Sequence, residues 1–97
     1  MATVQVLTSE GCLPCLRVKR ILKELQEEIP SLGVEEIDYA SPRGMKLAFD
    51  NNVLYPPAVF LDGKLIAKGK IYAEKMIPTI REASMTGTIR ESDGSRV

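Results

Sequence analysis

The sequence of 97 residues contains no histidine and no tryptophan, and it has only two cysteines. Without histidine the chain lacks the usual general base and the commonest zinc ligand, and it cannot form a Ser-His or Cys-His catalytic pair. Basic and acidic residues number 13 each, so the formal net charge is zero, and the basic residues are scattered along the chain. Neither nucleic acid nor an anionic membrane is therefore expected as a partner.

Long hydrophobic runs are also missing. No segment approaches the roughly 20 apolar residues of a membrane span, and residues 1–10 have no basic stretch followed by an apolar one. We expect a cytoplasmic, monomeric protein. Its length allows one domain with one modest core, which we expect over residues 1–85, followed by a flexible polar tail over residues 86–97.

The two cysteines form one cluster, Cys12-Leu13-Pro14-Cys15, between a strand-like run at residues 3–7 and an amphipathic helix. Thiols three positions apart at a helix start can reach each other's sulfur. Two cysteines are too few to staple a small secreted domain, whereas C-x-x-C in a cytosolic chain indicates redox chemistry or metal binding. A pair of reduced structural thiols is the third, less informative interpretation.

The helix after the cysteines is predicted by apolar residues at helical spacing, namely Val18, Ile21, Leu22, Leu25 and Ile29. We expect Arg17, Lys19 and Arg20 to lie on its solvated face, without a catalytic role. Residues 34–39 predict a second strand, and an edge position would tolerate the charges of Glu35 and Glu36.

Four further elements follow. Ser41 and Pro42 form a helix-start signal, and this helix should end near residue 51 and bury Met45, Ala48 and Phe49. Residues 58–61 and 64–68 form a hairpin around Asp62-Gly63. A last helix at residues 72–84, interrupted by Pro78, should bury its apolar face, which consists of Met76, Ile77, Ile80 and Ala83.

The predicted order is strand, helix, strand, helix, strand, strand, helix. We expect the first two units to be right-handed crossovers with parallel early strands, and the hairpin to add an antiparallel pair. The result is an α/β fold with a four-stranded mixed sheet and helices on both faces.

This order, the C-x-x-C at the first helix and residues 53–63 (VLYPPAVFLDG) together resemble the thioredoxin superfamily, especially its short glutaredoxin-sized members. The resemblance covers roughly residues 3–84. It implies a thioredoxin-like fold and no bound cofactor or metal, only a redox-active Cys12–Cys15 disulfide. It also assigns Pro57 as the cis-proline that faces the cysteines, and Gly69 as the glycine that commonly follows the last strand.

The two cysteines receive different roles. At a helix cap, Cys12 would meet unpaired backbone N–H groups, which should lower its pKa from about 8.5 into the range of roughly 3.5–7.5. Cys12 is therefore the expected nucleophile and Cys15, one turn further in, the resolving thiol. Pro14 stiffens the bridge between them.

The substrate is expected to contact Pro57, Pro56, Tyr55 and Leu13. A cis X-Pro bond lets the preceding residue pair with an extended substrate, but that residue is Pro56, which has no N–H. Ser9 and Gly11 also depart from the family, because a lysine common in glutathione-using glutaredoxins and the tryptophan of thioredoxins stand at those places.

The leading hypothesis is a dithiol–disulfide oxidoreductase. It would reduce oxidised proteins or low-molecular-weight disulfides and take electrons from a thioredoxin-reductase-like flavoprotein or from glutathione. A thiolate metal-carrying module is one alternative, although metal chaperones with C-x-x-C usually have two strands between their helices. A non-catalytic thioredoxin-like adaptor is the other.

Overall fold

A computed structural model describes residues 2–86 of the chain. Its elements follow the predicted order: β1 (Thr3–Thr8), α1 (Leu13–Glu28), β2 (Gly33–Asp38), α2 (Pro42–Asp50), β3 (Ala58–Leu61), β4 (Lys64–Lys68) and α3 (Ala73–Thr86). The tail predicted over residues 86–97 lies outside the described residues from residue 87 onward, so its flexibility stays a prediction.

The four strands form one mixed sheet in the order β2-β1-β3-β4. β1 is parallel to β2 and antiparallel to β3, and β3 and β4 form the antiparallel hairpin. Leu7 at the end of β1 pairs with Ala58 at the start of β3. The chain that leaves β1 toward Cys12 and the chain that enters β3 from Pro57 therefore lie at the same end of the sheet.

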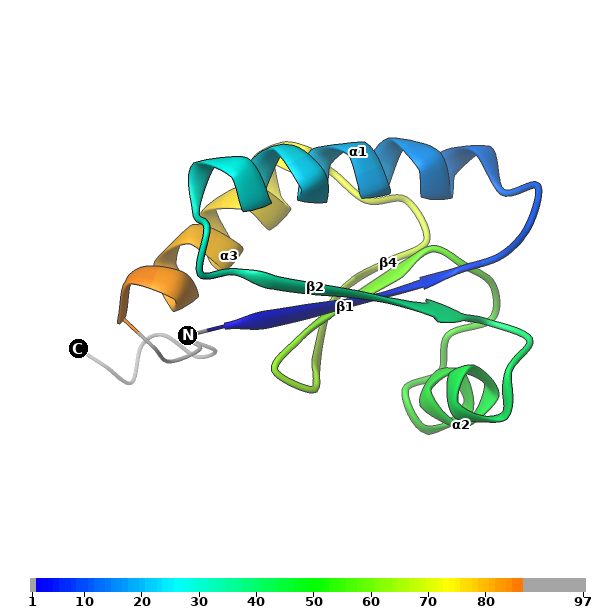
Figure 1. The fold of residues 1–97 in the computed structure, drawn as a ribbon. Coiled ribbons are helices and arrows are strands. Elements are labelled where there is room, and N and C mark those ends of the chain that lie inside the picture. The colour runs from blue at the N-terminus through cyan, green and yellow to red at the C-terminus, as the bar shows by residue number, and fades with distance from the viewer. Residues whose placement is uncertain (1, 87–97) are drawn as a thin grey trace.

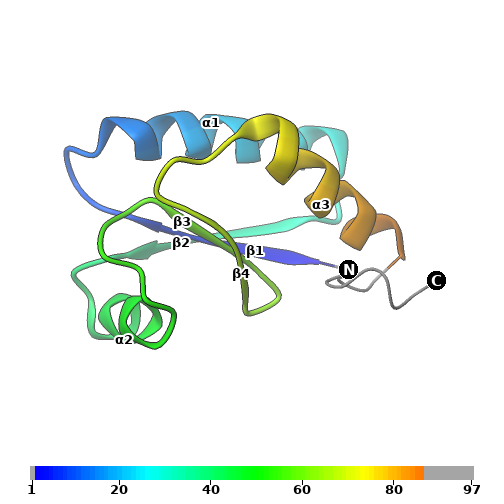
Figure 2. The same cartoon turned by 180° about the vertical axis from the view of Figure 1, so that it is seen from behind.

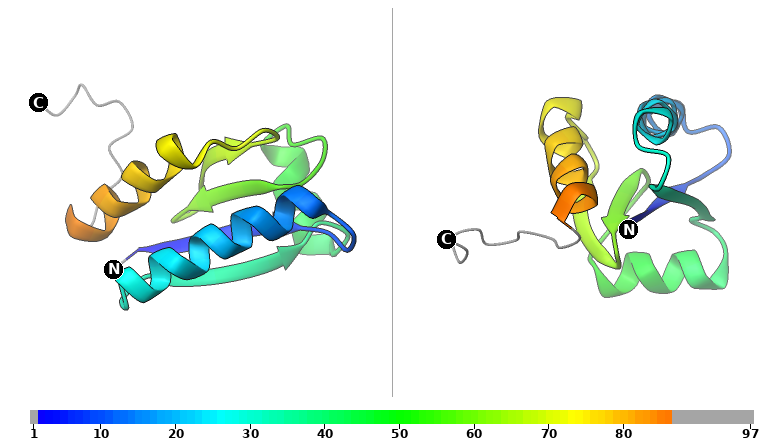
Figure 3. Two further views of the ribbon diagram at one scale, coloured as in Figure 1. Left: turned by 90° about the horizontal axis from the view of Figure 1, so that it is seen from above. Right: turned by 60° about the vertical axis from the view of Figure 1, so that its left-hand side comes forward.

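Helices cover both faces of the sheet, as predicted. α1 and α3 lie on one face and α2 on the other (Figure 1), and the view from above shows α1 and α3 beside each other (Figure 3). From behind, the segment between β4 and α3 is seen to climb from the sheet to the face of these two helices (Figure 2).

Alternate residues of the strands supply two apolar cores. The larger core packs Val4, Val6, Val59 and Leu61 against α1 and α3, and the smaller one packs Leu7, Ala58 and Phe60 toward α2. The predicted apolar faces of α1 and α3 pack on the core: Val18, Leu22, Leu25, Met76, Ile80 and Ala83 are buried, and Ile21, Ile29 and Ile77 are half-buried against it. None of the helices within residues 2–86 has both the length and the apolar character needed to span a membrane.

The expectation of a second parallel crossover is wrong, because β3 runs antiparallel to β1. The reason is the direction of α2. This short helix is seen end-on in Figure 1, where the strands lie across the view, so it crosses the sheet instead of running back along it. The chain consequently enters β3 at the end of the sheet where it left β2.

The predicted buried face of α2 is wrong in two of its three residues. Ala48 is buried, but Met45 is 53 % exposed and Phe49 85 % exposed, and Gly44 is buried in their place. A Cβ atom on Gly44 would overlap the Asp38 carbonyl oxygen. Small residues therefore face the sheet because the helix backbone approaches β2 closely.

The predicted turns and caps are confirmed. The Ser41 hydroxyl accepts a hydrogen bond from the Gly44 N–H at 2.9 Å and caps α2. Asp62 and Gly63 both have positive φ angles, 49° and 88°, as a two-residue hairpin turn requires.

Candidate active site

The loop between β1 and α1 places Cys12 at the N-cap of the helix. Gly11 has a φ of 80°, a left-handed conformation that glycine adopts without steric cost. The Cys12 N–H donates to the Ser9 carbonyl oxygen at 3.2 Å. Cys12 itself is extended, with φ −85° and ψ 105°, which is the usual N-cap conformation.

Cys12 and Cys15 form a disulfide, and their Cα atoms are 5.3 Å apart. The Cys15 N–H donates a hydrogen bond to Cys12 Sγ at 3.1 Å. Cys12 is half-buried, whereas Cys15 is only 1 % exposed. A large molecule that approaches this end of α1 therefore reaches Cys12 before Cys15.

The segment that enters β3 contains a cis peptide bond between Pro56 and Pro57. Pro57 is buried and Pro56 half-buried. The Pro57 carbonyl oxygen accepts a hydrogen bond at 3.0 Å from the N–H of Gly69, whose φ is 67°. Gly69 therefore ties the segment after β4 to the proline segment.

A groove of about 350 Å³ lies beside the disulfide-bearing turn. Its walls come from α1, the proline segment and the connection between β4 and α3, and they consist of Pro14, Arg17, Val18, Pro57, Gly69, Lys70, Ile71 and Tyr72. The structure thus brings together three of the residues expected from the sequence, Pro14, Pro57 and Gly69. Leu13 is not among the walls, and its side chain is exposed.

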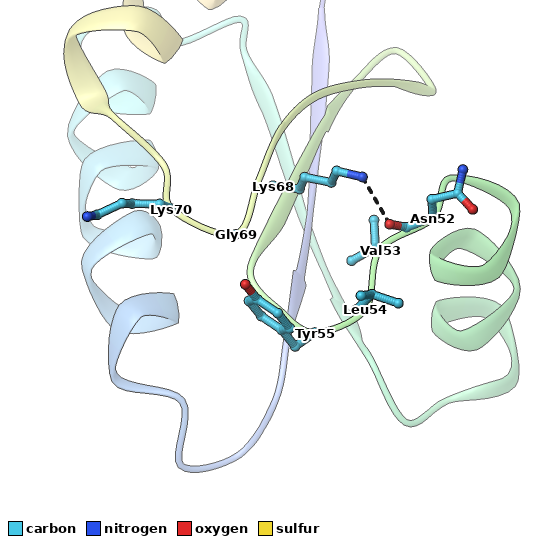
Figure 4. A pocket seen from close by; sticks show the side chains of 7 residues that line it. All are labelled: Asn52, Val53, Leu54, Tyr55, Lys68, Gly69 and Lys70. Carbon is cyan, nitrogen blue, oxygen red and sulfur yellow. Dashed lines mark hydrogen bonds between the residues drawn. The ribbon is translucent and has the colours of Figure 1, made fainter.

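Tyr55, expected at the substrate, lines a different pocket of about 220 Å³. Figure 4 shows this pocket between the segment before β3 and the segment after β4. The Lys68 ammonium closes one side through a hydrogen bond to the Asn52 carbonyl oxygen at 2.9 Å. The Tyr39 hydroxyl holds the same loop by donating to the Leu54 carbonyl oxygen at 2.9 Å.

Five groove residues were not expected from the sequence at this site: Arg17, Val18, Lys70, Ile71 and Tyr72. Arg17 was assigned to a solvated helix face, but its guanidinium Nη1 donates to the Ile71 carbonyl oxygen at 3.2 Å. Arg17 and Ile71 are more than 50 positions apart in the sequence. The one local signal for the later three is that they directly follow Gly69.

Two ion pairs join neighbouring elements of the fold. Arg81 on α3 donates two hydrogen bonds to Glu28 at the end of α1, at 2.7 and 2.9 Å. Arg43 on α2 binds Glu35 on β2 in the same two-pronged manner. Hydrogen bonding to these guanidinium groups lowers the pKa of Glu28 and of Glu35 below their ordinary values.

The thiolate metal site considered from the sequence uses the same two cysteines. Across residues 2–86, no group of three or more histidine, cysteine, aspartate or glutamate residues is arranged to hold a metal ion. A single strand, β2, separates α1 from α2. The element order therefore differs from the two intervening strands that are usual in C-x-x-C metal chaperones.

The topology of the sheet and the disulfide at the start of α1 define the class of protein. The chain has the thioredoxin fold with a C-x-x-C disulfide, so the fold that the resemblance implies is confirmed.

Three solved structures illustrate this similarity in fold. The chain is similar to oxidised thioredoxin O2 from Arabidopsis thaliana, with a TM-score of 0.66 and 16% identity over 84% of this chain and 74% of that one. A mutant thioredoxin from Halobacterium salinarum NRC-1 gives a TM-score of 0.65 and 20% identity over 86% and 74%. The thioredoxin-like protein BC3987 is 27% identical over 77% of this chain and 96% of its own, with a TM-score of 0.58. No protein-family model and no curated protein sequence matches the chain.

Proposed function

We propose that the chain is a dithiol–disulfide oxidoreductase that reduces disulfides of oxidised proteins through Cys12 and Cys15. One observation carries this proposal: in a thioredoxin fold, the disulfide joins a partly exposed cysteine at a helix N-cap to a buried cysteine one turn further in. That arrangement separates an attacking sulfur from a resolving one.

The reaction begins from the reduced pair. The Cys12 thiolate attacks one sulfur of the substrate disulfide, so that a Cys12–substrate S–S bond forms, the substrate S–S bond breaks and one substrate thiolate leaves. The Cys15 thiolate then attacks Cys12 Sγ. The Cys12–Cys15 bond forms, the mixed disulfide breaks and the second substrate sulfur leaves. Two electrons have passed to the substrate, and the departing thiolates take up the two protons of the dithiol.

The helix start favours Cys12 as the attacking group. Backbone N–H groups of the first turn lack carbonyl partners and, together with the helix dipole, stabilise a negative sulfur at this position. The Cys15 N–H already points at Cys12 Sγ. Burial of Cys15 delays its reaction until the mixed disulfide has formed beside it.

We assign the groove beside Pro14 and Pro57 to the substrate segment that carries the attacked disulfide. The residue before Pro57 is Pro56, which offers a carbonyl oxygen but has no N–H. The Pro57 carbonyl oxygen is already bound to Gly69. Main-chain pairing with the substrate is therefore weaker than a complete strand pair, and side chains of the groove contribute more to recognition.

Each turnover leaves the disulfide form, so a two-electron donor must restore the dithiol. We assign this role to a thioredoxin-reductase-like flavoprotein or to glutathione. Both fit the cytoplasmic location that we propose, because thiols are kept reduced there.

Reduction of insulin disulfides, with dithiothreitol as the terminal reductant, tests the proposal. The wild-type chain should accelerate the reaction, whereas Cys12→Ser should be no faster than dithiothreitol alone. Ser31→Ala is the matched control, since Ser31 is exposed in the turn between α1 and β2. Turnover by Cys12→Ser at the wild-type rate would overturn the proposed function.

A further inference from the structure

Helix α1 carries its charges in an order that its own dipole disfavours. The charged residues of its first half, residues 13–20, are all cations, namely Arg17, Lys19 and Arg20, and its second half holds Lys23 followed by the acids Glu24, Glu27 and Glu28. A helix dipole favours acidic residues near the N-terminus and basic residues near the C-terminus. The helix dipole therefore does not account for Arg17, Lys19 and Arg20, which lie on the half of the helix that carries the disulfide.

The charged residues that line the groove beside the disulfide are all positive. Two of its lining residues, Arg17 and Lys70, are cations, and no carboxylate lines it among the residues that the structure describes. The remaining walls are formed by proline, glycine and apolar or aromatic side chains. A segment that enters this groove therefore meets positive charge inside a largely apolar surface.

Arg17 is held in place across the groove. Its Nη1 donates to the Ile71 carbonyl oxygen at 3.2 Å, which fixes the guanidinium between α1 and the segment after β4. A guanidinium has further N–H groups that can bind a carboxylate in a two-pronged manner. The fixed guanidinium loses little side-chain freedom when it does so.

Lys70 completes the pair. Within residues 2–86 it makes no hydrogen bond or ion pair, whereas the nearby Lys68 is bound to the Asn52 carbonyl oxygen. Figure 4 shows the Lys70 side chain directed away from Lys68, on the side where α1 lies. Its ammonium is therefore available to a molecule in the groove that Arg17 lines.

We propose that Arg17 and Lys70 select protein substrates that carry an aspartate or glutamate within a few residues of the attacked cysteine. This inference rests on the proposed function, because it assigns a substrate preference to the same site. The carboxylate binds between the two cations while the flanking chain covers the apolar walls. The preference is electrostatic, so it should weaken as salt is added.

Matched peptides test this preference. Two peptides contain the same intramolecular disulfide and differ only in glutamate or glutamine on either side of one cysteine. The pre-reduced protein is mixed with each peptide in the absence of other reductants, and the second-order rate constant for release of peptide thiols is measured. We expect the glutamate peptide to react about fivefold faster at low salt, the upper end of what an exposed ion pair contributes.

Variants show whether the two cations cause the preference. Arg17→Gln and Lys70→Gln should each reduce the ratio of the two rate constants, and the double variant should bring it close to one. Lys46→Gln is the matched control, because Lys46 lies on α2 on the opposite face of the sheet, and it should keep the wild-type ratio. The ratio of the two rate constants does not depend on the amount of folded protein, because a general loss of folded protein slows the reduction of both peptides equally.

The outcomes separate this inference from the proposed function. Equal rates for both peptides with the wild-type protein overturn the carboxylate preference and leave the oxidoreductase intact. No reduction of either peptide overturns the oxidoreductase itself. Glutathione disulfide also carries carboxylates, so it forms a separate arm. If the two variants slow its reduction while the wild-type peptide ratio is one, the groove recognises a small thiol and the inference fails.

Discussion

The backbone N–H of Cys15 donates a hydrogen bond to the Sγ atom of Cys12, 3.1 Å away. This N–H belongs to the first turn of α1, where amides have no carbonyl partner within the helix. The sulfur of Cys12 thus takes the position that a serine or aspartate oxygen usually occupies as a helix cap. Once the disulfide is reduced, the same donor faces the sulfur that carries negative charge.

We predict that Cys12 of the reduced protein is alkylated by iodoacetamide with a pH midpoint below that of free cysteine, about 8.5. The amide and the helix dipole stabilise the thiolate relative to the thiol. The rate is measured against pH on Cys15→Ser, in which Cys12 is the only thiol. The reciprocal variant Cys12→Ser should react more slowly, since Cys15 is buried. A midpoint of Cys15→Ser at or above that of free cysteine contradicts this explanation.

A second prediction concerns the contact between α2 and β2. Gly44→Ala should destabilise the fold by about 2 kcal/mol, because the new Cβ overlaps the Asp38 carbonyl oxygen and the helix must shift. Helix propensity alone predicts the opposite sign, since alanine is favoured over glycine by about 1 kcal/mol. Urea unfolding measures the difference.

The matched control is Met45→Ala at the next, exposed position of the same helix. It should change the free energy of unfolding by no more than about 0.5 kcal/mol. Stabilisation by Gly44→Ala would show that the helix does not approach β2 as closely as the structure has it.

A third prediction follows from the lowered pKa values of Glu28 and Glu35, which arise from hydrogen bonds to Arg81 and Arg43. A lowered pKa means that the unfolded chain binds protons more readily than the folded one. The pairs therefore stabilise the fold fully above the ordinary carboxylate pKa, and this contribution disappears as the pH falls through the lowered values.

The double variant Arg43→Met/Arg81→Met isolates this effect, because every other carboxylate titrates in both proteins. The difference in Tm between wild type and variant should be present at pH 7, shrink below about pH 4.5 and be smaller in high salt. A difference in Tm between wild type and variant that stays constant over the acid range would contradict this explanation. Both pairs are exposed, so the offset itself is expected to be small.

Local chemistry explains which parts of the fold could be predicted. The Ser41 cap, the Asp62-Gly63 turn and the apolar spacing of α1 each act within a few residues, and the structure has them where the sequence indicates. The prediction of the buried face of α2 was wrong because Met45 and Phe49 have the right helical spacing but are too large for the space between the helix and β2. The approach of the helix to the Asp38 carbonyl admits only a residue such as Gly44, and that constraint lies in another element.

The residues of the site also fall into those that the sequence predicts and those that it does not. Cys12 and Cys15 lie three positions apart and are predicted by their spacing, and Pro57 is predicted by the resemblance to the thioredoxin superfamily. Arg17 was assigned to solvent because its helix face is exposed. Its contact with Ile71 depends on how the segment after β4 returns over the sheet, which no local pattern reports.

The most direct test of the account is to trap the mixed disulfide. The reduced Cys15→Ser variant is mixed with an oxidised substrate protein, and the products are analysed by mass spectrometry without reductant. We predict a covalent adduct of one substrate chain on Cys12, which persists because no resolving thiol is present, and no comparable adduct with Cys12→Ser. Absence of the adduct in Cys15→Ser, or an equal yield through Cys15 in Cys12→Ser, would contradict the assignment of Cys12 as the attacking and Cys15 as the resolving thiol.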